Sequence, residues 1–322
     1  MQIIWTGKIY SDGRHNAFTG LAYFKDKYFL AFRNSAGHMQ AESYQIIMTS
    51  PDGKKWDLLQ KKHMPDGMPV DYRDSCFLLH EDKLLLYSFC TPIVDGKRGK
   101  SYTQIQIISG NSGKISEPQI IQRDCVLWKP IKLGDTFYAP GYSCGKCHYQ
   151  ADLYCSAGGL DWKKKTHLAA GSEIALCPLD ENKLTAFVRT ETPPYHLEIF
   201  ESRKPFAAWT KISEIPRIIQ CPHYFRNNGK VYLIGRERPD YMKTADSNNP
   251  SFGRHRTKIW SFENHTLREV LELPSAGDNS YPGTVFMPDG TLLISYYSQH
   301  ECGGEKWAEM MPADIFVAAV RI

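Results

Sequence analysis

The feature that most constrains this chain is an apolar hairpin that occurs six times along it. Each copy places two short apolar stretches on either side of a polar turn of Asp, Asn, Glu, Lys or Gly. Such residues close tight hairpins, and glycine adopts the positive φ that some of these turns need. The copies recur at roughly 50 residues, which is the spacing of propeller blades. The six copies cover residues 20–33, 76–87, 130–139, 174–189, 223–236 and 280–297.

A second, more polar class of hairpin lies between the apolar ones. An apolar hairpin followed by an amphipathic one predicts a four-stranded blade, with inner strands buried on both faces and outer strands that alternate. The last apolar hairpin has only one strand after it, residues 315–320, and an unpaired strand, residues 2–5, precedes the first. Pairing these two ends would close the ring and remove exposed sheet edges.

These patterns predict an all-β fold, a six-bladed β-propeller of four-stranded antiparallel blades that forms one domain over residues 1–322. The N-terminal strand is expected to pair into the last blade and close the ring. A β-sandwich with an extra domain is the competing fold, and the even repeat disfavours it.

Composition excludes some functions. The net charge of +4 is small for 322 residues, which argues against a nucleic-acid binder that works by general electrostatics. No apolar run approaches a membrane-spanning length, so no membrane partner is expected. No signal peptide is visible and the nine cysteines cannot all pair, which favours a cytoplasmic protein with reduced thiols. A secreted protein would be expected if the chain had been shortened.

The candidate site follows from the propeller geometry. The starts of the inner strands and the ends of the strands that follow them share one rim, and in this chain those positions are rich in ionisable and aromatic residues. Three long segments, 91–103, 237–257 and 298–313, are expected to rise from the same rim as loops. Arginine binds carboxylates in a bidentate manner, so the arginines predict an anionic glycan as ligand. The predicted catalytic residues are Tyr281, Glu173, His15 and Asp74, and the predicted substrate-binding residues are Arg33, His38, Arg73, Lys129, Arg189, His223 and Arg236.

Each catalytic candidate has a chemical role and a structural alternative. Tyr281 could attack an anomeric carbon if Glu173 accepted its proton, or it could simply pack over the rim. His15 suits proton transfer near neutral pH, or a structural hydrogen bond. Asp74 could donate a proton, or pair with Arg73.

Several motifs resemble the sialidase-like propellers with Asp-box (BNR) repeats, a largely glycoside hydrolase-like superfamily. The run Ser50-Pro-Asp-Gly-Lys-Lys-Trp56 is an Asp-box, and residues 156–162 form a degraded copy. Ser172-Glu173, followed by Arg189, resembles the sialidase segment with a strand-opening glutamate and a triad arginine. Ser280-Tyr281 resembles the segment with the nucleophilic tyrosine. The resemblance implies a carbohydrate-active enzyme without a cofactor.

One position departs from the sialidase pattern. Sialidases open their first blade with Tyr-Arg-Ile-Pro, whereas this chain has His15-Asn16 at the position aligned with it. Some similar propellers with histidine there act as α-L-rhamnosidases on rhamnosyl-glucuronate or as related polysaccharide lyases. The hypotheses are therefore an exo-acting glycoside hydrolase on an acidic glycan that contains uronate or rhamnose, a lyase on a uronate-containing glycan, and a non-catalytic glycan-binding propeller.

A cysteine-rich segment invites a metal interpretation. Cys144, Cys147 and His148 lie close together, with Cys155 further on. A zinc site normally needs a second ligand pair at finger-like spacing, and the chain lacks one here. We therefore expect reduced thiols and no metal.

Overall fold

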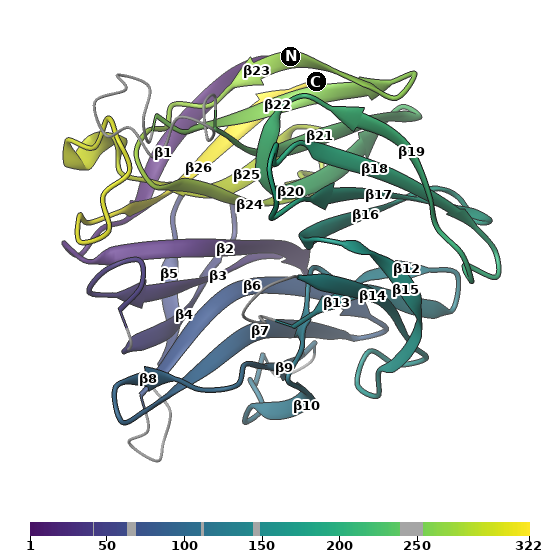
Figure 1. Ribbon diagram of the computed structural model, residues 1–322. Coiled ribbons are helices and arrows are strands. Elements are labelled where there is room, and N and C mark those ends of the chain that lie inside the picture. The colour runs from purple at the N-terminus through teal and green to yellow at the C-terminus, as the bar shows by residue number, and fades with distance from the viewer. Residues whose placement is uncertain (41, 63–68, 111–112, 144–148, 239–253) are drawn as a thin grey trace.

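The computed structural model describes residues 1–40, 42–62, 69–110, 113–143, 149–238 and 254–322. Six antiparallel sheets lie around a common centre, each with its first strand innermost (Figure 1). The predicted six-bladed propeller is confirmed. The first blade contains β2 (His15–Phe24), β3 (Lys27–Ser35), β4 (Ser43–Ser50) and β5 (Asp57–Lys62). The second contains β6 (Val70–His80), β7 (Lys83–Val94), β8 (Lys97–Arg98), β9 (Tyr102–Ser109) and β10 (Gln119–Arg123). The third contains β11 (Val126–Leu127), β12 (Ile131–Leu133), β13 (Thr136–Tyr142), β14 (Gln150–Ser156) and β15 (Lys163–Ala170).

The other three blades follow the same order from the centre outwards. The fourth blade contains β16 (Ser172–Asp180), β17 (Lys183–Arg189), β18 (Leu197–Arg203) and β19 (Thr210–Ile215). The fifth contains β20 (Ile218–Asn227), β21 (Lys230–Arg238), β22 (Arg256–Glu263) and β23 (Thr266–Glu272). The sixth contains β24 (Asn279–Phe286), β25 (Leu292–Ser298), β26 (Asp314–Arg321) and β1 (Gln2–Tyr10).

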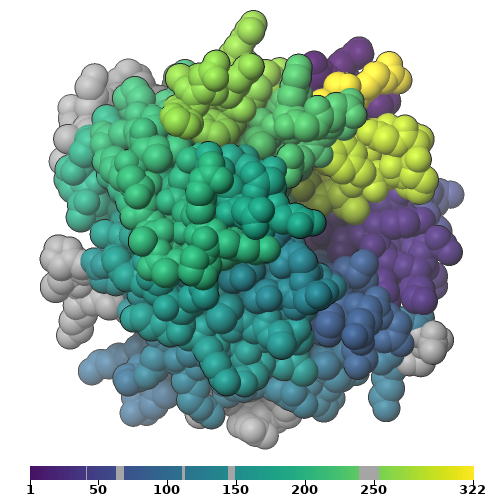
Figure 2. All heavy atoms as spheres, turned by 90° about the vertical axis from the view of Figure 1, so that its right-hand side faces the viewer, coloured from purple at the N-terminus to yellow at the C-terminus, as the bar shows by residue number. Residues whose placement is uncertain are grey.

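The N-terminal strand closes the ring as predicted. β1 pairs antiparallel with β26 and is the outermost strand of the last blade. The purple N-terminal and yellow C-terminal segments accordingly lie side by side in Figures 1 and 2. This pairing joins the two ends of the chain in one sheet, so the last blade is as complete as the others.

Burial follows the distance of a strand from the centre. The second strands β3 and β25 are buried along nearly their whole length, whereas the outer strand β1 alternates between exposed and half-buried positions. This is the pattern expected of strands covered on both faces inside and on one face outside. The apolar cores lie between neighbouring blades, so each hairpin is stabilised by contacts that are distant in sequence.

Every blade has one irregularity at the same place in its inner strand. In five blades the pairing of the first two strands shifts register there, and in the third blade the inner strand is split into β11 and β12. A non-glycine residue with positive φ sits at each irregularity, although this region is costly for L-residues. We call these the six bulge residues: Phe18, Asp74, Lys129, Glu173, Cys221 and Tyr281.

The Asp-box has the structural role that its sequence predicts. The Ser50 hydroxyl accepts a bond from the Gly53 amide at 2.8 Å, and the Trp56 indole donates to the Gly53 carbonyl at 3.0 Å. The degraded copy keeps both bonds: the Gly159 amide donates to Ser156 at 2.9 Å and the Trp162 indole to the Gly159 carbonyl at 2.9 Å. The turn therefore persists without the aspartate.

One segment expected to be a loop is partly strand. β7 runs on to Val94 and pairs with β8, so a short hairpin occupies much of residues 91–103. Most of the 237–257 segment and the Cys144, Cys147 and His148 cluster lie outside the described residues. In the described part of the chain, no helix has the length and apolar character needed to cross a membrane, and seven cysteines are free thiols.

Candidate functional site

A pocket of 1160 Å³ opens on the rim where the inner strands begin. Its lining includes the bulge residues Asp74, Glu173 and Tyr281, together with Arg73, Arg189 and Arg236. A smaller cavity of 450 Å³ is lined by residues on the other side of the same irregularities, among them Lys129 and His223. The larger pocket combines acids, arginines and aromatic rings, so it is the candidate site.

Glu173 and Tyr281 meet at the floor of this pocket. The Tyr281 hydroxyl donates a hydrogen bond of 2.6 Å to Oε1 of Glu173. The other carboxylate oxygen, Oε2, lies 2.6 Å from Nη1 of Arg189 and accepts the Cys221 amide at 2.7 Å. Residues from the fourth, fifth and sixth blades thus form one unit, which we call the Glu173 centre: Glu173, Tyr281, Arg189 and Cys221.

The bulges explain how these groups meet. Glu173, Cys221 and Tyr281 are all bulge residues, with φ of 46°, 48° and 48°. The same position in the first blade holds Phe18, whose ring centroid lies 4.7 Å from that of Tyr281. A bulge re-aims one side chain of a strand, and here the same bulge in successive blades brings side chains together at the axis.

The ionisation states in the Glu173 centre are unequal. Burial opposes ionisation of Glu173, but the charge of Arg189 and the hydrogen bonds from Tyr281 and Cys221 lower its pKa below the usual value. Burial raises the pKa of Tyr281 well above its usual range, and the negative charge of Glu173 raises it further. The resting site therefore holds a neutral phenol whose proton points at an ionised carboxylate.

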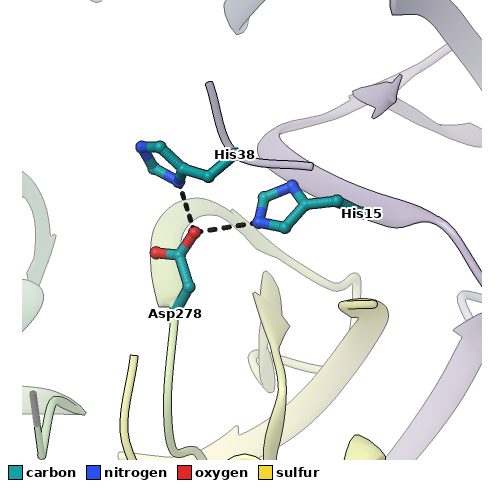
Figure 3. Close-up of side chains that lie close together, drawn as sticks. All are labelled: His15, His38 and Asp278. Atoms are coloured by element: carbon teal, nitrogen blue, oxygen red, sulfur yellow. Dashed lines mark hydrogen bonds and ion pairs between the residues drawn. The ribbon is translucent and has the colours of Figure 1, made fainter. Parts of the chain in front are cut away.

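A second buried carboxylate, Asp278, is built from similar parts. Its Oδ1 lies 2.7 Å from Nη1 of Arg236 and accepts the Tyr297 hydroxyl at 2.8 Å. Its Oδ2 faces two histidines, Nε2 of His15 at 2.9 Å and Nδ1 of His38 (Figure 3). We call these five residues the Asp278 centre. Burial opposes ionisation of Asp278, but its histidine and arginine partners hold its pKa well below the usual value.

The two histidines differ in access to the pocket. His15 is fully buried, whereas the His38 side chain is 14% exposed and lines the pocket. Burial lowers the pKa of both rings, which favours their neutral forms. With Nδ1 of His38 donating to Asp278, Nε2 carries the lone pair and points away from the carboxylate (Figure 3).

The donor atoms of His15, His38 and Asp278 lie within 4.8 Å of one another, which is the spacing that a metal site would need. Two observations oppose it. Arg236 already places a guanidinium on the same carboxylate. Nδ1 of His15 is buried without a partner among the described residues, whereas a metal-bound histidine usually donates through its second nitrogen. The geometry favours a hydrogen-bonded network.

Asp74 is the third acid of the pocket. Burial and the nearby charge of Glu173 raise its pKa to about 7. Its Oδ1 is buried and has no hydrogen-bond partner among the described residues. A carboxyl group in these surroundings is protonated for part of the time at neutral pH, and its protonated form can donate to a bound ligand.

The structure brings most of the predicted site residues together. Tyr281, Glu173, Asp74, His38, Arg73, Arg189 and Arg236 line the pocket. The other four are not among its described lining residues. His15 lies behind Asp278, Arg33 is buried against Asp71, Lys129 donates to the Pro282 carbonyl at 2.8 Å, and His223 bonds Thr284 at 3.0 Å.

Sequence reasoning missed Phe18, Asp71, Cys221 and Asp278. Three of the bulge residues, Phe18, Asp74 and Cys221, precede the positive-φ turn residue of their hairpin by seven positions, at Lys25, Glu81 and Asn228. Counting back seven positions from these turns could therefore have found Phe18 and Cys221. The register shifts of the first and last blades place Phe18, not His15, at the position that Tyr281 occupies in the last blade.

No model of a known protein family matches the chain, and no curated protein matches it. Solved structures do. A protein of unknown function from Dyadobacter fermentans superposes with a TM-score of 0.78 at 17% identity, over 100% of this chain and 99% of that one.

Two kinds of glycosidase share the fold. The Trypanosoma rangeli sialidase in complex with sialic acid matches with a TM-score of 0.69 and 12% identity over 95% of this chain, which spans 54% of the sialidase. A Bombyx mori β-fructofuranosidase of family GH32 matches with a TM-score of 0.53 and 14% identity over 96% of this chain and 62% of that one. The chain is therefore a six-bladed β-propeller that is structurally similar to sialidases and GH32 fructofuranosidases.

Proposed function

We propose that the protein is a glycoside hydrolase that acts on an acidic glycan. The observation that carries the proposal is the 2.6 Å hydrogen bond from the Tyr281 hydroxyl to Glu173 at the floor of the pocket. A neutral phenol is a weak nucleophile, and an adjacent ionised carboxylate is the base that activates it. The likeness in fold to sialidases and GH32 enzymes supports the class of reaction.

The proposed reaction has two steps. Asp74 gives its proton to the leaving glycosidic oxygen while the Tyr281 oxygen bonds to the anomeric carbon and its proton passes to Glu173. Water then attacks the glycosyl-tyrosine, Asp74 takes the water proton, the carbon–Tyr281 bond breaks, and Glu173 returns the proton to Tyr281. Each group ends as it began, and the anomeric configuration is retained.

The test is a trapping experiment. Wild type and Tyr281→Phe are incubated with fluorinated glycosyl fluorides of uronic acids, which slow the second step. We expect a mass increase on the peptide that contains Tyr281 in the wild type and none in the variant. Release of sugar with inverted configuration, or a label on another residue, would contradict the proposal.

The Asp278 centre favours a second candidate function, a lyase that acts on a uronate-containing glycan. His38 faces the pocket with Nε2 while Asp278 holds Nδ1, which is the arrangement of an oriented base. In this reaction Nε2 takes the proton beside the uronate carboxylate, a carbon–carbon double bond forms, and the leaving oxygen takes the Tyr281 proton. A lyase releases an unsaturated product that absorbs in the ultraviolet, and a hydrolase does not.

A further inference from the structure

A third buried carboxylate, Asp71, is surrounded by more positive charge than it can balance. Its Oδ1 lies 2.7 Å from Nε of Arg33, and its Oδ2 lies 2.8 Å from Nε of Arg73 and 2.9 Å from Nη2 of Arg98. These arginines come from β3, β6 and β8, so three segments direct guanidinium groups at one point. One carboxylate neutralises only one of the three charges.

Among the described residues, no second carboxylate completes this cluster. Among the described residues, Arg33, Arg73 and Arg98 form ion pairs only with Asp71. Asp74 is adjacent to Arg73, but burial keeps its pKa raised to about 7, so it is protonated for part of the time at neutral pH. Burial, opposed by Asp71 and reinforced by the charge of Arg73, lowers the pKa of Arg33 to about 10. A buried excess of positive charge is costly unless an anion joins it.

One of the three arginines has all its side-chain nitrogens engaged within the protein, and the other two have N–H groups available to a ligand. Arg33 is fully engaged, since Nη1 and Nη2 donate to the carbonyls of Gly37 and Gln40. Arg73 and Arg98 both line the pocket, and the Arg98 side chain is 36% exposed. Their remaining N–H groups have no acceptor among the described residues, apart from the His38 carbonyl and the Met39 sulfur on Nη2 of Arg73.

This cluster adjoins the Glu173 centre. The guanidinium carbon of Arg73 lies 4.9 Å from the Phe18 ring centroid, and that ring lies 4.7 Å from the Tyr281 ring. A group held by Arg73 and Arg98 would therefore share the pocket with whatever contacts Tyr281. Arg189 and Arg236 are different in kind, because each already has its own carboxylate.

We propose that Arg73 and Arg98 form an oxyanion subsite that binds a carboxylate or sulfate group of the substrate. The inference rests on the proposed function for the nature of the ligand, an acidic sugar. The forked guanidinium suits either oxyanion, with bidentate geometry for the planar carboxylate. The subsite serves hydrolysis and elimination alike, because it fixes the acid group and takes no part in bond breaking.

The test compares the removal of two positively charged side chains, Arg98 and Lys100, that lie close together in the sequence and both line the pocket. Arg98→Gln removes a charge from the Asp71 cluster. Lys100→Gln removes one from the same pocket lining, where Lys100 pairs with Asp124 at 2.9 Å and the side chains are 84% and 54% exposed. Titration calorimetry measures binding of D-glucuronate, inorganic sulfate and D-glucose to the wild type and both variants. The glucuronate and sulfate arms identify which oxyanion the subsite prefers.

We expect one of the two anions to bind the wild type at least about tenfold more tightly than glucose, because each 1.4 kcal/mol of added interaction is a factor of ten. Arg98→Gln should remove most of that preference, and Lys100→Gln should change it less than about twofold because exposed charges are screened. Equal effects of the two variants, or no preference for either anion over glucose, would overturn the subsite.

Failure of the subsite is separable from failure of the proposed function. Tyr281→Phe should leave anion binding unchanged, since its hydroxyl contacts Glu173 and not the Asp71 cluster. If Tyr281→Phe keeps full glycosidase activity while Arg98→Gln weakens anion binding, the mechanism is wrong and the subsite stands. If Tyr281→Phe is inactive and Arg98→Gln binds like the wild type, the subsite is wrong and the mechanism stands.

Discussion

Glu173 and Asp278 are two buried carboxylates that each bind one arginine and one tyrosine, yet they present different groups to the pocket. At the Glu173 centre the tyrosine, Tyr281, lines the pocket. At the Asp278 centre the tyrosine, Tyr297, is fully buried, and His38 lines the pocket instead. The supporting charges differ too. Arg189 has a second carboxylate, Glu191, at 3.0 Å, but Asp278 is the one carboxylate paired with Arg236 among the described residues.

The comparison teaches that the same buried trio can serve two purposes. Where the carboxylate faces a phenol that lines the pocket, as Glu173 does, it is placed to accept the phenol proton. Where the phenol is sealed in the core, the carboxylate fixes neighbouring groups in place. Five predictions test these assignments.

The largest effect is expected from removing one hydroxyl. Tyr281→Phe should lower glycosidase activity by at least about a thousandfold, because loss of a nucleophile has an effect of that order or larger. Tyr297→Phe removes the equivalent hydroxyl of the Asp278 centre and should cost about 1 kcal/mol of stability through one lost hydrogen bond. Its activity loss should stay under about tenfold, since Tyr297 does not line the pocket. Steady-state kinetics on both variants makes the comparison, and equal activity losses would erase the distinction.

The next effect concerns stability. Asp278→Ala leaves Arg236 buried without its carboxylate and should cost about 3–5 kcal/mol. Glu173→Ala should cost about 1–2 kcal/mol less, because Arg189 keeps Glu191 and breaking a buried pair is costly mainly through the charge left behind. Urea unfolding of the two variants gives both free energies. If Glu173→Ala is the more destabilising, the account of the two arginines is wrong.

The third prediction is a pH dependence set by Asp74. Because burial raises its pKa to about 7, the proton-donating form is lost as pH rises through that value, and activity should fall about tenfold per pH unit above it. Asp74→Asn cannot donate a proton and should remove this limb while lowering the maximum by about 10²-fold or more.

The same shift has a consequence for stability with a definite sign. The folded protein holds this proton more tightly than the unfolded chain, whose carboxyl has the usual value of 3.8. The contribution of Asp74 to the free energy of unfolding should therefore be full below about pH 4 and decline between about pH 4 and pH 7. Unfolding free energies of wild type minus Asp74→Asn across that window measure it, and a rise with pH would contradict the assignment.

The smallest effect is expected from metals. If the Asp278 centre is a hydrogen-bonded network, a chelator should not change the melting temperature, and added zinc should raise it by less than about 1 °C. A ligand that binds only the folded state stabilises it in proportion to ln(1 + [L]/Kd), so a true metal site would respond clearly. His15→Ala serves as the matched variant, since a zinc-induced rise that disappears in it would place the metal among these residues.

Much of the fold is written locally in the sequence, which is why it could be predicted. Polar turns such as Asp289-Gly290 and the alternation in the outer strands each depend on a few adjacent residues. The closure of the ring also followed, because one strand was left unpaired at each end.

The site was only partly predictable, because its contacts join residues from different blades. The sequence indicated which rim carries Glu173 and Tyr281, but not that Cys221 would donate its amide to the same carboxylate. Asp278 precedes its strand by one residue, in a segment with no distinctive pattern, and its four side-chain partners are distant in sequence. Whether a polar group such as His15 faces the pocket or the core depends on packing that no single blade specifies.

The six bulge residues have a consequence for how such a protein can change. Each bulge keeps an L-residue in a costly conformation, which persists only where the surrounding structure over-determines it. The same backbone irregularity therefore presents six different residue types around the axis. The propeller therefore offers six equivalent backbone positions around its axis, and in this protein three of them hold ionisable groups that face the pocket.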